Sequence, residues 1–383
     1  MKILLTGPFG NVGLSTLEEL IKRNYNIRVF DIKNKKNKKV ARKFKNQIEI
    51  IWGDLRNYED LEKAVKGIDI VIHLAAIIPP LADKFPELAE DVNIGGTKNI
   101  IEAIKIQKSQ NNKPKLIFTS SIAVYGDRRE NPMIKLTDSL NPSKGDYYAV
   151  TKIKAEKIIQ ESDIDFAIFR LTYITSVNKL EMDPLMFHMP LDTCIEICDT
   201  KDVGLALVNA IECNEVWGGT FHIAGGEQCR TTYREYINNM MEIFGLGRDF
   251  LPEEAYEQKD FHCGYMDTEK SQNVLKYQIH TLEDYYEEVE KKVGPRRFFM
   301  PMVKWAVRLN LLKHSEAYRR NKFFRKKIGA FTVSENKLIR KILYNNFNKI
   351  DMLEQKVYEL EKVIHFLIEK DEYLDLLEQK EQI

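Results

Sequence analysis

The chain has 383 residues, of which 44% are hydrophobic and 30% charged, and its 58 basic and 57 acidic side chains leave a formal net charge of +1. This composition is typical of a globular protein of two or three domains, and it excludes collagen-like, low-complexity and wholly disordered chains. The balanced charge argues against nucleic acid as a partner, and five scattered cysteines predict free thiols in a reducing, cytoplasmic compartment.

Short apolar runs alternate with helix-period segments up to about residue 290. The predicted strands are Lys2–Thr6, Asn26–Asp31, Ile48–Trp52, Ile70–Leu74, Lys115–Ser120 and Phe166–Leu171. The predicted helices between them include Leu17–Arg23, Asp60–Val65 and Thr97–Ile106. Residues 173–199 read as irregular, and a helix at Asp202–Ile211 and a strand at Gly219–Ile223 follow. This alternation predicts an α/β fold with a doubly wound parallel sheet covered by helices on both faces.

A glycine-rich turn follows the first strand directly, in the run Gly7-Pro8-Phe9-Gly10-Asn11-Val12-Gly13. Gly7 permits a tight turn, Gly10 lets the backbone approach a pyrophosphate, and Gly13 lets the helix pack closely on the strand. The start of the following helix offers unpaired N–H groups and a positive dipole end to phosphates. The turn therefore predicts a dinucleotide site.

An acid ends the next strand, Asp31, which lies 18 residues after Gly13. A carboxylate there can accept hydrogen bonds from both ribose hydroxyls and would repel a 2′-phosphate, which favours NAD over NADP. The lysine-rich stretch at residues 33–39 opposes that choice, and we interpret it as a solvated loop.

Tyr148 and Lys152 are four residues apart, so they share one face of a predicted helix. A nearby ammonium favours the phenolate and lowers the pKa of a phenol from about 10. Ser121, at the end of the strand Lys115–Ser120, could hydrogen-bond the substrate oxygen. Together the three would remove a proton from a hydroxyl while hydride leaves its carbon for nicotinamide.

Further motifs occur in a fixed order around these residues. They are Gly53-Asp54-Leu55, His73-Leu74-Ala75-Ala76, Asn93-x-x-Gly96-Thr97, Ser120-Ser121-x-x-Val124-Tyr125-Gly126 and Arg170. With the glycine turn, Asp31 and Tyr148-x-x-x-Lys152, this set resembles the extended short-chain dehydrogenase/reductases, the NAD-dependent sugar epimerase/dehydratase family, over about residues 1–290. The resemblance implies a Rossmann-type fold and the cofactor NAD. It implies that Tyr148 is the base, Lys152 its activator and a ligand of the nicotinamide ribose, and Ser121 the hydroxyl that polarises the substrate.

The same resemblance implies the other cofactor contacts. Those at the pyrophosphate and the adenine are Gly7, Gly10, Asn11, Val12, Gly13, Asp54 and Leu55. Those that line or brace the cofactor cleft are Leu74, Ala75, Ala76 and Asn93, with Thr172 near the nicotinamide. Tyr147 adjoins Tyr148 but has the wrong offset from Lys152 to be the base.

The residues after Ser121 bear on the reaction. The family's dehydratases resemble one another in a Thr-Asp-Glu triplet where this chain has Ser121-Ile122-Ala123, which argues against dehydration. The form Ser121-x-x-Val124-Tyr125-Gly126 is similar to sugar epimerases of the UDP-galactose 4-epimerase type. The resemblance thus implies an epimerase for a sugar or sugar nucleotide, in which hydride returns to the substrate and NAD is regenerated.

Two alternatives to an epimerase stay open, and the first arises because the region predicted to bind the substrate is short. About thirty residues separate Arg170 from Asp202, and Lys179 is the one basic residue between 173 and 200. Either later residues such as Arg230 and Arg234 hold a nucleotide, or the substrate carries none. The alternatives are an NAD-dependent dehydrogenase or reductase of a smaller hydroxyl or keto substrate, and a non-catalytic NAD-binding scaffold that acts through its C-terminal tail.

The sequence predicts no metal site, no signal peptide and no membrane-spanning helix. Seven histidines without spaced carboxylates predict no metal site, and His73 and His222 are interpreted as structural. Cys194 and Cys198 lie in an apolar run and are interpreted as structural thiols. The N-terminal apolar run is too short for a signal peptide, and no apolar run is long enough to span a bilayer.

The resemblance ends before residue 296. Residues 296–328 hold eleven Lys and Arg against one acid, Glu316, together with several aromatic side chains. This basic aromatic segment could lie on an anionic membrane at the inner face, contact acidic protein including residues 351–383, or pack as a helical appendage on the main domain. Its apolar residues at 298–312 do not form one clean stripe.

A long helix with a coiled-coil-like seam is predicted after Ser334. Its apolar positions are Ile350, Leu353, Val357, Leu360, Ile364 and Leu367. Such a seam must be buried, either by self-association into a homo-oligomer or by packing on the catalytic domain. The predicted domains are 1–172 for the cofactor, 173–295 for the substrate with returning sheet elements, 296–333 for the basic segment and 334–383 for the seam helix.

Overall fold

The computed structural model of the chain describes residues 1–109, 113–178, 180 and 184–322. The chain divides into two units, Met1–Arg320 and Asn321–Ile383, and all described residues but two belong to the first. The predicted seam at 350–367 lies outside the described residues.

A seven-stranded parallel sheet, with the strand order β10-β7-β5-β4-β1-β2-β3, forms the centre of the first unit. Its strands are β1 (Lys2–Thr6), β2 (Asn26–Asp31), β3 (Glu49–Trp52), β4 (Ile70–His73), β5 (Lys115–Ser121), β7 (Phe166–Leu171) and β10 (Gly219–Ile223). The order reverses between β1 and β4, which opens a crevice at the carboxyl ends of these strands. The predicted fold class, a Rossmann-type α/β sheet, is confirmed.

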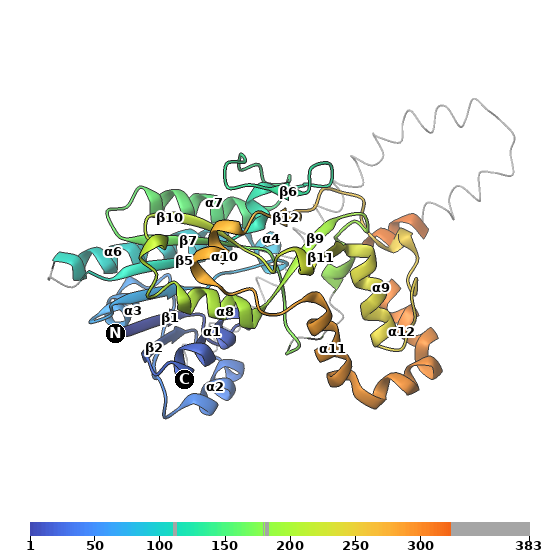
Figure 1. Cartoon of the computed structure of the whole chain (residues 1–383), viewed down its shortest axis with the longest axis horizontal. Coiled ribbons are helices and arrows are strands. Elements are labelled where there is room, and N and C mark those ends of the chain that lie inside the picture. The colour runs from blue at the N-terminus through green and yellow to red at the C-terminus, as the bar shows by residue number, and fades with distance from the viewer. Residues whose placement is uncertain (110–112, 179, 181–183, 323–383) are drawn as a thin grey trace, which may run out of the picture. The chain divides into compact units, whose positions relative to one another are not determined.

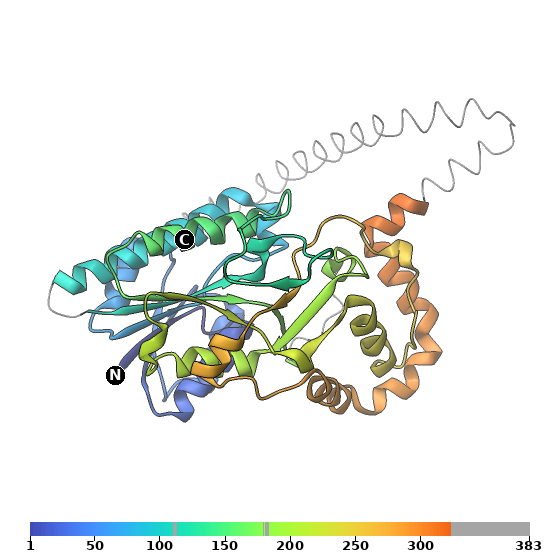
Figure 2. The ribbon, with the colours of Figure 1, turned by 45° about the horizontal axis from the view of Figure 1, so that its top comes forward.

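Helices cover both faces of this sheet (Figures 1 and 2). Those on one face are α3 (Tyr58–Val65), α6 (Gly96–Ser109) and α7 (Tyr147–Gln160). Those on the other are α1 (Asn11–Lys22) and α8 (Thr200–Asn209). Successive residues of β1 face opposite sides of the sheet. Leu4 packs in the hydrophobic cluster that contains residues of α3, α6 and α7, whereas Ile3 and Leu5 pack in the cluster that contains residues of α1 and α8. Strands buried on both faces explain the unbroken apolar runs of the sequence.

A smaller region holds the elements that follow β7. A three-stranded sheet has the order β11-β9-β8, formed by β8 (Tyr173–Thr175), β9 (Cys194–Asp199) and β11 (Arg230–Thr232). The pair β6 (Met133–Ile134) and β12 (Tyr265–Met266) lies beside it. The helices are α9 (Tyr233–Ile243), α11 (Leu282–Val293) and α12 (Met300–His314), which share one hydrophobic cluster.

Two predictions of local structure are wrong. Residues 173–199 are not irregular throughout, because they contain β8 and β9, and Pro184 and Pro190 lie in the connection between these strands. The lysine-rich stretch is not a loop but the helix α2 (Lys35–Ala41), since Asn34 caps it by accepting a hydrogen bond from the Asn37 N–H. The remaining short helices are α4 (Leu81–Lys84), α5 (Pro86–Glu90) and α10 (Glu269–Leu275).

Candidate active site

The glycine turn lies at the crevice and leaves the start of α1 open. Gly7 has a φ of +68°, and a Cβ on Gly13 would lie 2.1 Å from the Gly7 carbonyl oxygen. The conformation of the turn therefore requires glycine at position 7, and its packing requires glycine at position 13. A Cβ on Gly10 would meet nothing closer than 3.4 Å, and no side chain caps α1, which starts at Asn11. The first N–H groups of α1, with Asn11 and Val12, are thus available to a phosphate.

Asp31 closes the end of β2 beside this turn. Its Oδ1 accepts hydrogen bonds from Ile32 N (2.8 Å) and Asn37 Nδ2 (3.0 Å), and its Oδ2 accepts one from Phe9 N (3.4 Å). Burial raises the pKa of this carboxyl. Asn37 thus orients Asp31, a role that the sequence analysis missed because it interpreted residues 33–39 as a loop.

The segment after β4 forms the opposite wall of the crevice. Leu74 N and Ala75 N donate to Thr6 Oγ1, at 3.2 and 3.3 Å. Asn93 is buried, accepts from Ile77 N (2.7 Å) and donates to Ile77 O (2.9 Å) and to Thr151 Oγ1 (3.0 Å). It therefore braces this wall against the helix α7, as the resemblance implies. Ala76 lies between these anchored residues and is partly exposed.

The other predicted cofactor residues, Asp54, Leu55 and Thr172, differ from one another in burial and in their contacts. Asp54 is partly exposed and holds Arg56 in a salt bridge of 2.7 Å, which lowers the pKa of its carboxyl. Leu55 is buried against Gly96, where a Cβ would lie 2.7 Å from the Leu55 Cβ. Thr172 is buried just after β7 and donates to Glu196 O at 2.6 Å.

Ser121, Tyr148 and Lys152 come together where β5 ends and α7 begins. Tyr148 hydrogen-bonds the Ser121 side chain. The Lys152 ammonium donates to Thr119 O at 2.9 Å and lies 4.7 Å from the centre of the Phe118 ring and 5.7 Å from that of Tyr148. Tyr147, by contrast, is half exposed.

Burial opposes the charged forms of this pair. It raises the pKa of Tyr148, whereas the Ser121 hydrogen bond lowers it and the charge of Asp146 raises it. Burial also lowers the pKa of Lys152 to about 8, against the charge of Glu156, which raises it. The expected lowering of the Tyr148 pKa by Lys152 is not found, because burial outweighs the other effects. Displaced pKa values of this kind cluster at functional sites.

A buried network of hydrogen bonds joins α7 to the seven-stranded sheet. Glu156, one helical turn after Lys152, accepts two hydrogen bonds from Arg170 at 3.0 and 2.6 Å. Arg170 donates to the Tyr125 hydroxyl at 2.5 Å, which in turn contacts His222 Nε2 at 2.7 Å. The network joins α7, β7 and β10 to the turn after β5. Tyr148, Lys152 and Glu156 share one helix face, so their spacing was the signal that could have identified Glu156.

The two histidines interpreted as structural lie in such buried networks. His73 contacts Thr6 Oγ1 at 2.8 Å, and burial lowers its pKa to about 3. Burial lowers the pKa of His222 to about 4. Both are neutral at physiological pH, which fits a structural role.

Glu196 on β9 is a fully buried acid that the sequence analysis missed. It accepts from Gly226 N (2.8 Å), Arg230 Nε (3.0 Å) and Met266 N (2.9 Å), and it thereby joins three segments of the smaller region. Burial raises its pKa, while Arg230 opposes that shift. Arg230 is thus engaged by Glu196, and Arg234 forms a 2.6 Å ion pair with Glu253. A single acid inside an apolar strand was the available signal.

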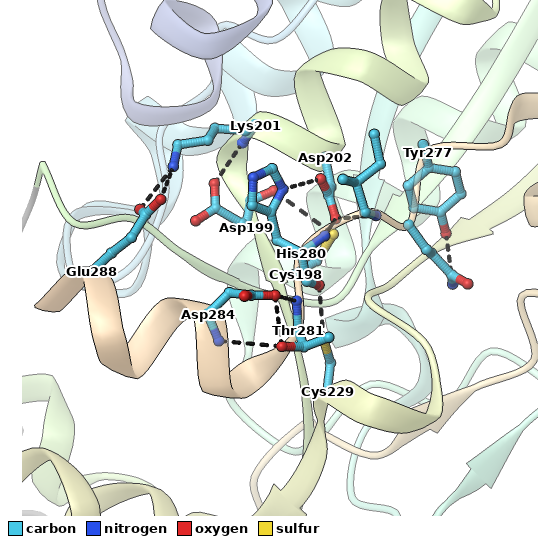
Figure 3. A network of polar contacts seen from close by, with 12 residues as sticks. Cys198, Asp199, Lys201, Asp202, Cys229, Tyr277, His280, Thr281, Asp284 and Glu288 are labelled. Carbon is cyan, nitrogen blue, oxygen red and sulfur yellow. Dashed lines mark hydrogen bonds and ion pairs between the residues drawn. The ribbon is translucent and has the colours of Figure 1, made fainter.

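A second network joins the smaller region to the sheet at the start of α8 (Figure 3). Asp202 accepts from Ile279 N (3.0 Å) and His280 N (2.9 Å) and contacts His280 Nδ1 at 2.6 Å. Lys201 reaches Glu288 of α11 at 2.6 Å. These contacts fix the chain between α10 and α11, and α11 itself, onto α8.

No group of His, Cys, Asp and Glu side chains in the described ranges has the arrangement of a metal site. All five cysteines are free thiols. Across residues 1–322, within those described, no helix combines the length and apolarity needed to cross a bilayer.

Residues 4–166 match the model of the 3-beta hydroxysteroid dehydrogenase/isomerase family. The chain is 36% identical over 156 residues to the human sterol-4-alpha-carboxylate 3-dehydrogenase, decarboxylating, a match that covers 40% of this chain and 38% of the relative. It is 29% identical over 200 residues to UDP-glucose 4-epimerase of Pisum sativum, which covers 48% of this chain and 55% of the relative. The matches thus span between 38% and 55% of the length of these relatives.

The fold is similar to that of UDP-glucuronic acid 4-epimerase from Bacillus cereus, solved in complex with UDP-glucuronic acid and NAD. The TM-score is 0.63 at 21% identity, over 77% of this chain and all of that one. The solved structure shows the likeness of the fold, and the family match over residues 4–166 agrees with the resemblance to the extended short-chain dehydrogenase/reductases. The expectations of an enzyme and of NAD as its cofactor agree with these comparisons.

Proposed function

We propose that this chain is an NAD-dependent epimerase of a sugar or sugar nucleotide that acts by transient removal of hydride. The observation that carries the proposal is the convergence of Ser121, Tyr148 and Lys152 at the carboxyl end of β5. The uncapped helix α1 follows the carboxyl end of β1 in the same parallel sheet. The relatives named as epimerases, and a neighbour in complex with a UDP-sugar and NAD, support the same choice.

The crevice fits a dinucleotide. The space over Gly10 and the free N–H groups at Asn11 and Val12 suit a pyrophosphate, and Asp31 suits the two hydroxyls of a ribose. Leu74, Ala75 and Ala76 line the wall that Asn93 braces. Lys152 would hold the nicotinamide ribose, with Thr172 nearby, and Asp54 and Leu55 would border the adenine. NAD would supply the acceptor and donor of hydride in this site.

The chain's own residues then handle the proton. Ser121 donates a hydrogen bond to the substrate oxygen, and the Tyr148 phenolate accepts the proton of that hydroxyl. The Lys152 ammonium stabilises the phenolate by its charge. After the keto sugar rotates and presents its opposite face to the hydride donor, Tyr148 returns the proton to the same oxygen. The residues thus serve as base and acid in the two halves of one cycle, and no second substrate is consumed.

The runner-up is an NAD-dependent dehydrogenase or reductase of a smaller hydroxyl or keto substrate. The observations that favour it are the short connection between β8 and β9, the engagement of Arg230 and Arg234 in ion pairs, and the sterol dehydrogenase relative. The presence of Ser121, Tyr148 and Lys152, with Lys152 Nζ 5.7 Å from the centre of the Tyr148 ring, argues against a non-catalytic scaffold. The two enzymes differ in their product, because a dehydrogenase accumulates NADH.

Replacement of the proposed base tests its role. Tyr148→Phe should lower turnover by at least a factor of about 1,000, since the step would lose its general base, while NAD binding by calorimetry should change little. Tyr147→Phe is the matched control, because it removes a hydroxyl one residue away that is exposed. Near-normal turnover of Tyr148→Phe, or equal losses in the two variants, would contradict the assignment.

A further inference from the structure

Large apolar side chains are exposed together in one short stretch near α12. Phe298, Phe299, Met302 and Trp305 are between 68% and 77% exposed, which makes them the most exposed large apolar side chains among the described residues. Single exposed apolar residues are ordinary, but a contiguous group of them usually marks a binding surface. Figure 2 shows α12, in orange, at the edge of the smaller region that is farthest from the seven-stranded sheet.

The helix α12 is apolar on two opposite sides. Met300, Val307 and Leu311 contact the hydrophobic cluster of the smaller region. Met302, Trp305 and Leu309 follow one another at spacings of three and four residues, so they lie along one other side, and all three are exposed. The latter row is termed the outer stripe. The sequence analysis found no single stripe at 298–312 because two faces are superimposed there.

Basic side chains surround the outer stripe. Residues 296–322 hold eight Lys and Arg and one acid, Glu316. Arg296, Arg308 and Lys313 are exposed, and none of them has an ion-pair partner within the described part of the chain. The charge of these three side chains is therefore available to an external partner.

We propose that the outer stripe, with Phe298 and Phe299, docks peripherally on an anionic phospholipid membrane. Aromatic and Met side chains gain by entering the boundary between headgroups and acyl chains, and Lys and Arg beside them gain from anionic headgroups. Both groups of residues occupy the same short stretch here. The docking is peripheral, since α12 is held to the protein by its other side.

The charge of the patch favours lipid over a second copy of the chain. Two copies that met through this surface would bring two strongly basic patches together, which raises the free energy of association. An acidic protein or the acidic residues 351–383 would also neutralise the charge, and the full-length chain is therefore the right object for the test.

Vesicle flotation measures the docking directly. The full chain should float with vesicles of phosphatidylcholine and phosphatidylglycerol at 7:3 and remain behind with phosphatidylcholine alone. The variant Met302→Ser/Trp305→Ser and the variant Arg308→Glu/Lys313→Glu should each lower the vesicle-bound fraction at least tenfold. Both variants should keep the wild-type affinity for NAD, which shows that they fold.

A matched charge control uses the exposed lysines of α2. Lys36→Glu/Lys39→Glu changes the same number of charges in a cluster without exposed aromatic side chains, and it should float like the wild type. Absence of flotation by the full chain, or equal flotation by the outer-stripe variant, would overturn the proposal. So would an equal loss in the α2 control, or a fall in oligomer mass caused by the outer-stripe variant without any vesicle binding.

Discussion

Gly10 and Gly13 belong to the same turn, but of these two positions only 13 lacks room for a Cβ atom. A Cβ on Gly13 would lie 2.1 Å from the Gly7 carbonyl oxygen, so this glycine is required by the packing of the turn itself. A Cβ on Gly10 would meet no atom closer than 3.4 Å, and its φ of −75° suits any residue. The structure alone gives no reason for a glycine at position 10. The approach of a phosphate gives one.

The two glycines should therefore respond differently to alanine. Gly10→Ala should keep the melting temperature near that of the wild type but weaken NAD binding at least tenfold, because the methyl group occupies the phosphate's place. Gly13→Ala should lower the free energy of unfolding by about 1–3 kcal/mol, the usual range for overpacking. Calorimetry and thermal denaturation measure the two effects. Unchanged NAD affinity in Gly10→Ala would argue that no phosphate lies there.

At the scale of the elements, α7 carries Tyr148 and Lys152, and a buried network fixes its position. Glu156 on α7 accepts hydrogen bonds from Arg170 on β7, and the Tyr125 hydroxyl links Arg170 to His222 on β10. The network needs a neutral His222, whose pKa burial lowers from 6.5 to about 4. An unfolded chain binds a proton at this histidine below pH 6.5, but the folded chain resists doing so. Stability from this group is therefore complete above pH 6.5 and is lost as the pH falls toward 4.

The free energy of unfolding should fall between pH 7 and pH 5, and His222 alone should account for about 2 kcal/mol of that loss. His222→Gln is less stable at pH 7, but its stability should fall less steeply with pH. His188→Gln, which changes an exposed histidine, should keep the wild-type slope. Urea denaturation at several pH values gives these slopes. An unchanged slope in His222→Gln would show that His222 takes up its proton equally in both states.

The sequence predicted the sheet well and the smaller region poorly. Strands buried on both faces are unbroken apolar runs, so β7 and β10 have the bounds predicted for them. Residues 173–199 were predicted to be irregular because of Pro184 and Pro190, which lie in the connection between β8 and β9. The partners of the buried Glu196 on β9, Gly226, Arg230 and Met266, lie far along the chain. Local pattern cannot show that an acid will find partners at such distances. The loop predicted at residues 33–39 fails for a different and local reason, because Asn34 caps the helix α2.

The candidate site was more predictable than its supports. The glycine turn and the Tyr148/Lys152 spacing are local features, and the structure brings Tyr148 and Lys152 to the end of β5. Glu156, Asn37 and Glu196 act through contacts that only folding creates, and the sequence analysis missed all three. The two faces of α12 were also hidden, because a helix that is apolar on opposite sides has no single periodic stripe.

At the scale of the whole molecule, the chain divides into the units Met1–Arg320 and Asn321–Ile383. The predicted seam from Ile350 to Leu367 favours a homo-oligomer in solution. Light scattering of the full chain should give a mass above 44.7 kDa, and Leu353→Glu/Leu360→Glu should reduce it toward that of one chain. Lys356→Glu, outside the seam positions, is the control. A single-chain mass for the wild type would favour packing of the seam on the catalytic domain.

The central claim is that hydride leaves the substrate and returns to it. The most direct test incubates the full chain, with NAD but no other oxidant, with a panel of UDP-hexoses and UDP-hexuronic acids and follows the sugars by NMR and NADH by absorbance. The account predicts that one sugar converts to its epimer until the two reach equilibrium, without accumulation of NADH. A keto or oxidised product that appears together with equimolar NADH would contradict it and establish the dehydrogenase instead.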